Sequence, residues 1–145
     1  MILLTSYEKI YDRFLQKITD YKMLDLMDTE IRQECAKWLS SAIARFRRCK
    51  NDLSQRDDEL ETFTVELLDV EIEILSTLMV SEWLAPQLNS VLYTSQFFGG
   101  KEERWFAQAN QLDKLMTLKG NNDLEAKKLM RDYGYQTKLW NREET

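Results

Sequence analysis

Residues 74–86 read ILSTLMVSEWLAP and place the most apolar stretch of the chain directly before its only proline. Eleven of the eighteen residues at 67–84 are apolar, and they are not confined to one stripe of a helix. A helix that is apolar on several sides has to be covered by neighbouring elements on those sides. The segment therefore predicts a long apolar helix at the centre of a domain.

Turn-forming residues are scarce in the rest of the chain as well. Four glycines and one proline punctuate 145 residues, fewer than a sheet-rich fold of this size usually needs. The length suits one domain with one core, and 43% hydrophobic content is well above that of disordered chains. We therefore expect an all-α fold, a single-domain helical bundle of about five helices.

The expected helices have recognisable ends. The first starts with a capping box of Thr5 and Glu8, and the second opens near Asp28 or Thr29. Alternating residues at 62–67 favour a short extended segment before the central helix. Proline lacks an N–H group and disfavours helical geometry in the residue before it, so the central helix should kink or end at Pro86. The next helix and the loop at 94–103 would then project towards a partner.

Glycines mark the expected ends of the last helices. One helix should end near Gly120, and Gly134 is suited to the left-handed position that closes another. Residues 1–134 would form the helical domain, and residues 135–145 an extended C-terminal tail. The apolar residues of this tail are too few for a core of their own, so they are candidates for contact with a neighbour, as is an aromatic pair before the glycines at 99–100. These interface candidates are Phe97, Phe98, Tyr135, Leu139 and Trp140.

Charge is distributed unevenly along the chain. Between residues 51 and 73, nine acidic residues face Arg56 alone, whereas residues 1–51 carry a net charge of +3. Such an asymmetry fits a subunit that meets copies of itself head to tail, and it also fits a plain solvated loop. Both interpretations remain open at this point.

The sequence lacks the residues on which much enzyme chemistry depends. There is no histidine, which removes the commonest general base and the commonest transition-metal ligand. Neither a phosphate-binding loop nor a dinucleotide-binding glycine motif occurs. Asp69, Glu73 and Glu66 could share a helix face as a metal or acid/base cluster, although an acidic run beside a core helix is far more often a solvated face. We expect a protein that is not an enzyme and needs no cofactor or metal.

The two cysteines cannot pair if they lie on one helix. Cys35 and Cys49 are fourteen residues apart, which corresponds to about 21 Å along a helix axis. Residues 1–4 are too short for a secretory signal, and no apolar run reaches membrane-spanning length. We expect an intracellular protein with no membrane partner.

A basic cluster lies at the expected end of the second helix. It comprises Arg45, Arg47, Arg48 and Lys50. Cations at a helix C-terminus are favoured by the helix dipole, which explains them structurally. They also support an alternative function, a small helical DNA-binding or regulatory protein, against which the sequence pI near 4.9 counts. The three arginines are candidates for a protein interface.

The central segment resembles the head–tail connector proteins of tailed bacteriophages, also called adaptor or head-completion proteins. The similar pattern is E-x-x-I-L-x-x-x-M-x-x-x-W-L-x-P, formed here by Glu71 and the packing residues Ile74, Leu75, Met79, Trp83, Leu84 and Pro86. A phenylalanine-containing helix end at 42–46 precedes it, and the segment WFAQANQL at 105–112 follows it. The resemblance covers roughly residues 7–118 and rests on packing residues.

The resemblance implies a structural virion protein. Members of this family assemble as a ring, typically a dodecamer, beneath the portal, where they join the head to the neck or tail and continue the DNA channel. The implied partners are copies of the chain, the portal protein and the next neck or tail protein. Genomic DNA would pass through the channel without sequence-specific binding. The implied location is the neck of the virion, after assembly in the host cytoplasm.

Overall fold

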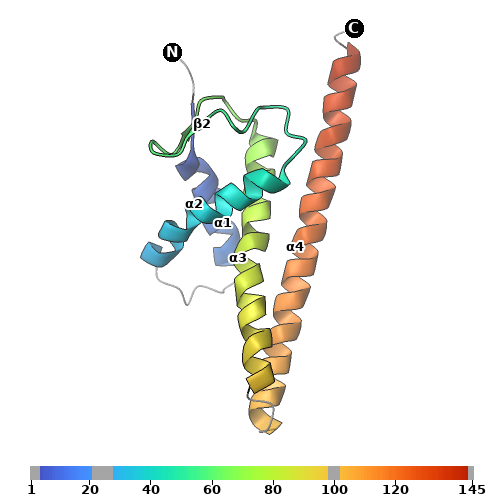
Figure 1. Ribbon diagram of the computed structural model, residues 1–145. Coiled ribbons are helices and arrows are strands. Elements are labelled where there is room, and N and C mark those ends of the chain that lie inside the picture. The colour runs from blue at the N-terminus through green and yellow to red at the C-terminus, as the bar shows by residue number, and fades with distance from the viewer. Residues whose placement is uncertain (1–3, 21–27, 98–101, 144–145) are drawn as a thin grey trace.

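The structure is a computed structural model that describes the backbone of residues 4–20, 28–97 and 102–143, and the side chains of 4–18, 33–90 and 109–136 (Figure 1). The described part of the chain holds four helices, α1 (Tyr7–Asp20), α2 (Asp28–Arg45), α3 (Asp69–Phe97) and α4 (Glu102–Glu143). It also holds three short strands, β1 (Thr5–Ser6), β2 (Arg56–Asp57) and β3 (Thr62–Phe63). The mostly helical class is confirmed, but four helices replace the expected five.

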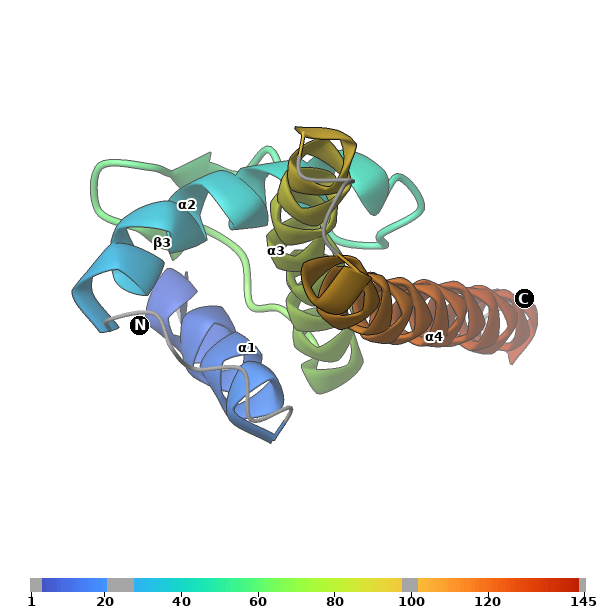
Figure 2. The same cartoon turned by 90° about the horizontal axis from the view of Figure 1, so that it is seen from below.

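Helix α3 lies at the centre of the molecule and contacts α1, α2 and α4. In Figure 2, α4 runs along the side of α3 that faces away from α1, while α2 crosses near the sheet. The expected packing residues of α3 are buried by this arrangement, except the proline, which is exposed. The buried ones are Ile74, Leu75, Met79, Trp83 and Leu84. The apolar periphery of α3 is thus covered by three different helices.

Three ion pairs place α1 against the start of α3. The Arg13 guanidinium donates to Asp69 Oδ1 at 2.6 Å and to Glu73 Oε2 at 3.4 Å. The Lys17 ammonium donates to Glu73 as well. Beneath these ion pairs the Phe14 ring packs edge-on to Trp83, with ring centroids 6.4 Å apart. The apolar face of α1 is therefore fixed in register with α3.

A three-stranded antiparallel sheet, in the order β1–β3–β2, joins the two ends of the first half of the chain. Thr5 pairs with Phe63, and Phe63 pairs in turn with Arg56. The Thr5 hydroxyl does not take its expected part in a capping box, because Ser6 Oγ accepts the Glu8 N–H at 3.3 Å, while Thr5 Oγ1 accepts the Leu67 N–H at 2.9 Å. A strand of two residues is too short to show an alternating pattern in the sequence. Only the strand at 62–63 lies in the segment that was predicted to be extended.

Of the two outcomes expected at Pro86, a kink or a helix end, the helix end is wrong, because α3 continues through the proline to Phe97. A proline inside a helix removes one backbone donor and crowds the preceding turn. Next to it, Gln87 Nε2 donates to the Trp83 carbonyl oxygen at 3.3 Å, which supplies a side-chain donor in the disturbed turn. Packing against α2 and α4 on both sides of Pro86 holds the helix together despite this local cost.

Replacing Pro86 with alanine should raise the free energy of unfolding, by about 1–3 kcal/mol, because alanine restores the missing donor in a helix interior. Chemical denaturation of the purified variant measures the change. Ala85→Ser, at the half-buried neighbouring position, controls for small changes at this site. A loss of stability in Pro86→Ala would mean that the proline ends a helix after all.

Helix α4 is also longer than expected. Gly120 and Gly134 lie inside it, and neither has the positive φ angle of a helix-closing glycine. Residues 135–143 continue the helix, so the expected extended tail is a second correction. Leu115 and Ala126 are buried on either side of Gly120, and Tyr133 is buried directly before Gly134. Their packing outweighs the cost of about 1 kcal/mol for each glycine in a helix interior.

The glycines offer a direct test of this continuous helix. A Cβ at either position would meet no atom within 4 Å. Gly120→Ala should therefore raise the free energy of unfolding by about 0.5–1 kcal/mol, as measured by thermal or denaturant unfolding. Lys114→Ala, at an exposed position of the same helix, should change stability much less, because lysine and alanine have similar helix propensities. If Gly120 instead adopted a left-handed helix end, alanine there would destabilise the protein.

Candidate interaction surfaces

A buried carboxylate connects the three segments that meet near the top of α3. Glu71 is fully buried and accepts hydrogen bonds from the Leu68 N–H at 2.7 Å, Asn51 Nδ2 at 2.7 Å, Tyr133 OH at 2.8 Å and Cys49 Sγ at 3.1 Å. We call Glu71 and these partners the Glu71 cluster. It links the loop after α2, the first turn of α3 and the middle of α4. The Leu68 contact also caps the first turn of α3.

The protonation states in the Glu71 cluster follow from burial and hydrogen bonding. Burial by itself raises the pKa of Glu71, but the four donated hydrogen bonds outweigh it and hold that pKa below its ordinary value. Burial and then the contact with Glu71 raise the pKa of Cys49 to about 12. Burial likewise raises the pKa of Tyr133. At neutral pH the cluster thus holds one carboxylate surrounded by protonated donors.

The Glu71 cluster fixes the loop at 46–50 against α4. Tyr133 OH accepts the Lys50 N–H at 2.7 Å, and the Phe46 ring packs edge-on to Tyr133 at 5.4 Å between centroids. Because a backbone N–H of the loop is bound to α4, the side chains next to it are held in a defined position. Arg48, in the middle of this loop, is therefore directed beside α4.

A second polar link lies further along the α3–α4 contact. The buried Asn122 side chain donates to the Thr77 carbonyl oxygen at 2.8 Å and to Ser81 Oγ at 2.6 Å. Ser81 donates to Asp123, which also pairs with Lys119 at 2.8 Å. Because buried polar groups must find their partners, these contacts set the register of α4 on α3. Asn122 thus joins α4 to α3.

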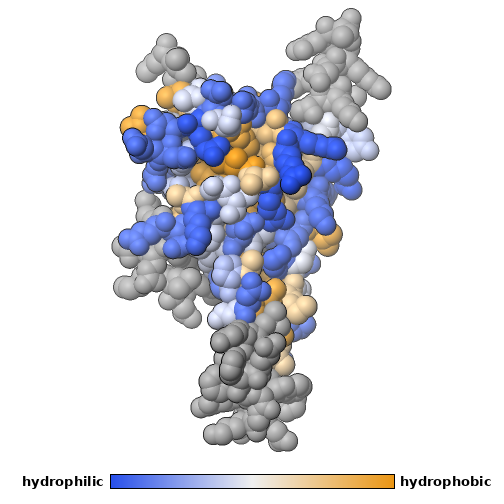
Figure 3. All heavy atoms as spheres, viewed as in Figure 1, coloured by the Kyte–Doolittle hydropathy of each residue, from blue (hydrophilic) through white to orange (hydrophobic). Residues whose placement is uncertain are grey.

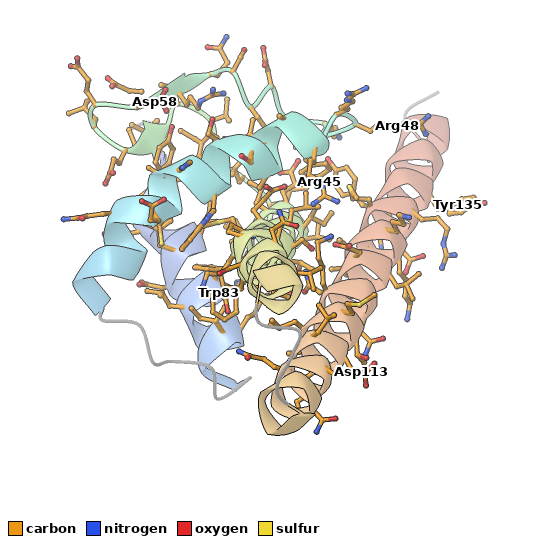
Figure 4. The ribbon with its side chains drawn as sticks, turned by 60° about the horizontal axis from the view of Figure 1, so that its bottom comes forward. Arg45, Arg48, Asp58, Trp83, Asp113 and Tyr135 are labelled. Atoms are coloured by element: carbon orange, nitrogen blue, oxygen red, sulfur yellow. The ribbon has the colours of Figure 1, made fainter. Side chains whose placement is uncertain are left out.

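The loop after α2 and α4 together form a small basic pocket, which contains two of the expected interface residues. It is lined by Arg48, Met130, Arg131, Gly134 and Tyr135 and has a volume of about 360 Å³. Arg48 and Tyr135 are exposed, and Tyr135 retains 64% of its accessible surface. Figure 4 shows both at the same edge of the molecule. Two guanidinium groups beside a methionine and a tyrosine suit an acidic group next to an apolar one.

An acidic hairpin forms the opposite edge of the molecule. It runs from β2 to β3, and its tip is residues 58–61, with the sequence DELE. Leu60 at the tip is 74% exposed, the largest exposure among the exposed apolar side chains described. Figure 3 shows small apolar areas on this face within largely hydrophilic surroundings. An exposed leucine flanked by carboxylates is a candidate contact point.

The hairpin tip is held rigidly. Asp57 Oδ1 accepts the N–H groups of Glu59 and Leu60 at 3.0 and 3.1 Å. The Glu61 carbonyl oxygen accepts the Tyr7 N–H at 2.9 Å, and Glu61 itself adopts a left-handed φ of 52°. Tyr7 OH also donates to Asp58 at 2.7 Å. The tip is therefore ordered before any partner arrives, which lowers the entropic cost of binding.

The remaining expected interface residues are distributed differently. Arg45 ends α2 and donates to Glu82 on α3 at 3.3 Å, and Arg47 is exposed. Phe97 ends α3 and residues 139 and 140 lie in α4, but their side chains, like the whole of residue 98, lie outside the described residues. The sequence reasoning missed Met130, Arg131 and Leu60, because scattered single residues on a helix or a turn carry no pattern.

The candidate acidic cluster for a metal has another role. Asp69 and Glu73 pair with Arg13 and Lys17, and Glu66 is exposed. Among the described residues, no group of three or more metal-ligating side chains is arranged to hold an ion. None of the helices described is both long and apolar enough to cross a lipid bilayer.

A shallow groove between α2 and α3 surrounds the proline. Its lining includes Trp38, Trp83 and Pro86 together with Glu34 and Lys37, and its volume is about 530 Å³. Trp83 is 2% exposed, and its Nε1–H has no hydrogen-bond partner. Trp83 is the one buried residue in this lining, and the other lining residues are half-buried or exposed.

No protein-family model, curated protein or solved structure matches the chain.

Proposed function

We propose that this chain is a structural virion protein of a tailed phage, a head–tail connector that forms a ring below the portal. The proposal combines the resemblance of the central helix with the arrangement of its exposed surfaces. The pattern residues other than Pro86 are buried on α3, which contacts the three other helices described. Such a core leaves the outer faces free for contacts with neighbours.

The observation that carries the proposal is that two unlike, rigidly held surfaces lie at opposite edges. The hairpin tip around Asp58 lies at one edge, and the basic pocket with Arg48 and Tyr135 lies at the other, as Figure 4 shows. A subunit with two different complementary surfaces makes heterologous contacts, and such contacts close into rings when the rotation between copies permits. This geometry suits a ring-forming protein.

The role would be physical rather than chemical. Copies of the chain would form the ring, the portal and the next neck or tail protein would bind its two faces, and the genome would pass through its channel. The net charge of −5 would limit adhesion of DNA to the wall. The ring would assemble in the host cytoplasm and remain in the neck of the virion.

A DNA-binding or regulatory role is the second candidate, because Arg47 and Arg48 are exposed and no ion pair joins either to another described residue. Arg45, by contrast, pairs with Glu82 at 3.3 Å and is thus partly neutralised. The ion pair of Arg45 therefore lowers the number of unpaired positive charges that a phosphate backbone would contact in this cluster. Replacing Arg47 and Arg48 with glutamine should abolish DNA binding under the DNA-binding hypothesis and weaken self-association under the connector hypothesis.

Electron microscopy of the concentrated protein tests the connector proposal. We expect closed rings with an open centre, and native mass spectrometry should give their copy number. A population that forms only open chains, or only DNA-bound dimers, would contradict the proposal.

A further inference from the structure

We propose that copies of this chain join head to tail, with the hairpin tip of one copy, residues 58–61, inserted into the basic pocket of the next. This inference rests on the proposed assembly and identifies the surfaces that meet. It commits the pocket to one occupant, a second copy of the chain. Three properties of the two surfaces support the pairing: apolar fit, charge and placement.

The apolar fit concerns Leu60. Its side chain is largely exposed in the single chain, where it makes no contribution to the core. The pocket offers Met130 and the exposed ring of Tyr135 beside an opening of about 360 Å³. Inserting one leucine there would bury apolar surface on both partners, and a methionine adapts readily to the shape of such a guest.

The charges are complementary. Glu59 and Glu61 flank the leucine, and both are exposed with no ion pair to another described residue. Asp58, in contrast, is already used by Tyr7 and Arg56. Arg48 and Arg131 flank the pocket, and Arg131 has only a loose 3.6 Å contact with Asp132. Two carboxylates that make no ion pair within the described part of the chain, placed around one leucine, thus match two guanidinium groups around one apolar opening.

The placement allows both contacts in the same molecule. The hairpin and the upper part of α4 lie on opposite sides of the molecule in Figures 1, 2 and 4. A copy bound through its tip therefore keeps its pocket accessible for a third copy. The Glu71 cluster holds Arg48 beside α4, and the Asp57 turn holds the tip, so both partners are ordered in advance.

Two variants with one defective surface each provide the test. The tip variant carries Glu59→Gln with Leu60→Ser, and the pocket variant carries Arg48→Glu with Arg131→Glu. All four side chains are exposed, so the variants should fold like the natural chain, which circular dichroism and thermal unfolding verify. Glu125→Gln and Lys127→Glu, at exposed positions of α4 outside the pocket, serve as matched controls.

The natural chain should self-associate as its concentration rises, and each variant alone should do so at least about tenfold more weakly. A one-to-one mixture should form dimers that do not grow, because one partner lends an intact tip and the other an intact pocket. Raising the salt concentration should weaken these dimers. Analytical ultracentrifugation and native mass spectrometry measure each species.

Several results would overturn the head-to-tail contact: a natural chain that stays monomeric at all concentrations, variants that associate like the controls, or a mixture that fails to pair. Rings that form normally from both variants would refute this contact and leave the ring proposal standing. Capped dimers from the mixture, together with open chains and no rings from the natural protein, would refute the ring and leave the contact standing.

Discussion

Replacing Trp83 with alanine is expected to lower the free energy of unfolding by about 3–5 kcal/mol, because it leaves a large cavity where α1 meets α3. Trp83 is 2% exposed and packs against the edge of Phe14. Denaturant unfolding followed by circular dichroism measures the loss. A stabilising osmolyte, added equally to the natural chain and the variant, keeps the folded baseline of the variant measurable.

Two companion variants separate packing from hydrogen bonding at this position. Trp83→Phe keeps most of the ring and removes an N–H that has no partner, so its loss should stay below about 2 kcal/mol. Trp38→Ala removes a half-buried indole that packs on the same Phe14 at 5.5 Å, and it should cost less than Trp83→Ala. Equal losses for the two tryptophans would contradict a core centred on α3.

Replacing Glu71 with glutamine is expected to lower the free energy of unfolding by about 2–4 kcal/mol. The amide keeps one acceptor oxygen but turns an NH₂ group towards donors, so that some donors of the Glu71 cluster lose their partner. Glu66→Gln removes an exposed carboxylate five residues earlier and should be nearly neutral. Similar losses of unfolding free energy in both variants would show that Glu71 contributes only its negative charge and not its hydrogen bonds.

Acid titration provides a second test of Glu71. The hydrogen bonds hold the pKa of Glu71 in the folded protein below its value in the unfolded chain. The group therefore contributes its full stability above that unfolded value, and loses it as the pH falls through the lowered folded pKa. The stability gap between the natural chain and Glu71→Gln should accordingly be constant near neutral pH and shrink in this acid range. A gap that widened on acidification would contradict the assignment.

Periodicity predicted the elements that bury one clear apolar stripe. The stripe at Tyr7–Ile18 gave α1, and the residues from 31 to 46 gave α2. These predictions succeeded because side-chain spacing alone decides which face of a helix leaves water.

Proline and glycine residues were wrongly predicted to end helices at positions where packing against a partner helix stabilises the helix. Pro86, Gly120 and Gly134 each cost helix stability, yet all three lie within helices. The compensation comes from residues distant in sequence, such as Asn122, which reaches the Thr77 carbonyl oxygen of α3. The packing of α3 against α4 cannot be read from a single sequence. The destabilising effect of these residues on their helices was therefore given too much weight.

The interaction surfaces were only partly visible in the sequence. Exposed arginines near the end of α2 and the aromatic Tyr135 were identified, but their common pocket required the fold that brings residues 48 and 135 together. Glu71 looked like one of many acids in an acidic region. Its position three residues after Leu68, at the start of a helix, was the available signal of a capping role.

The central claim is that this chain works by assembling with copies of itself. The most direct test is the mass of the purified protein across a concentration series, by light scattering, with and without duplex DNA. We expect a mass that rises with concentration towards a closed multimer and does not respond to DNA. A mass that stays at one or two chains and increases only when DNA is added would contradict it.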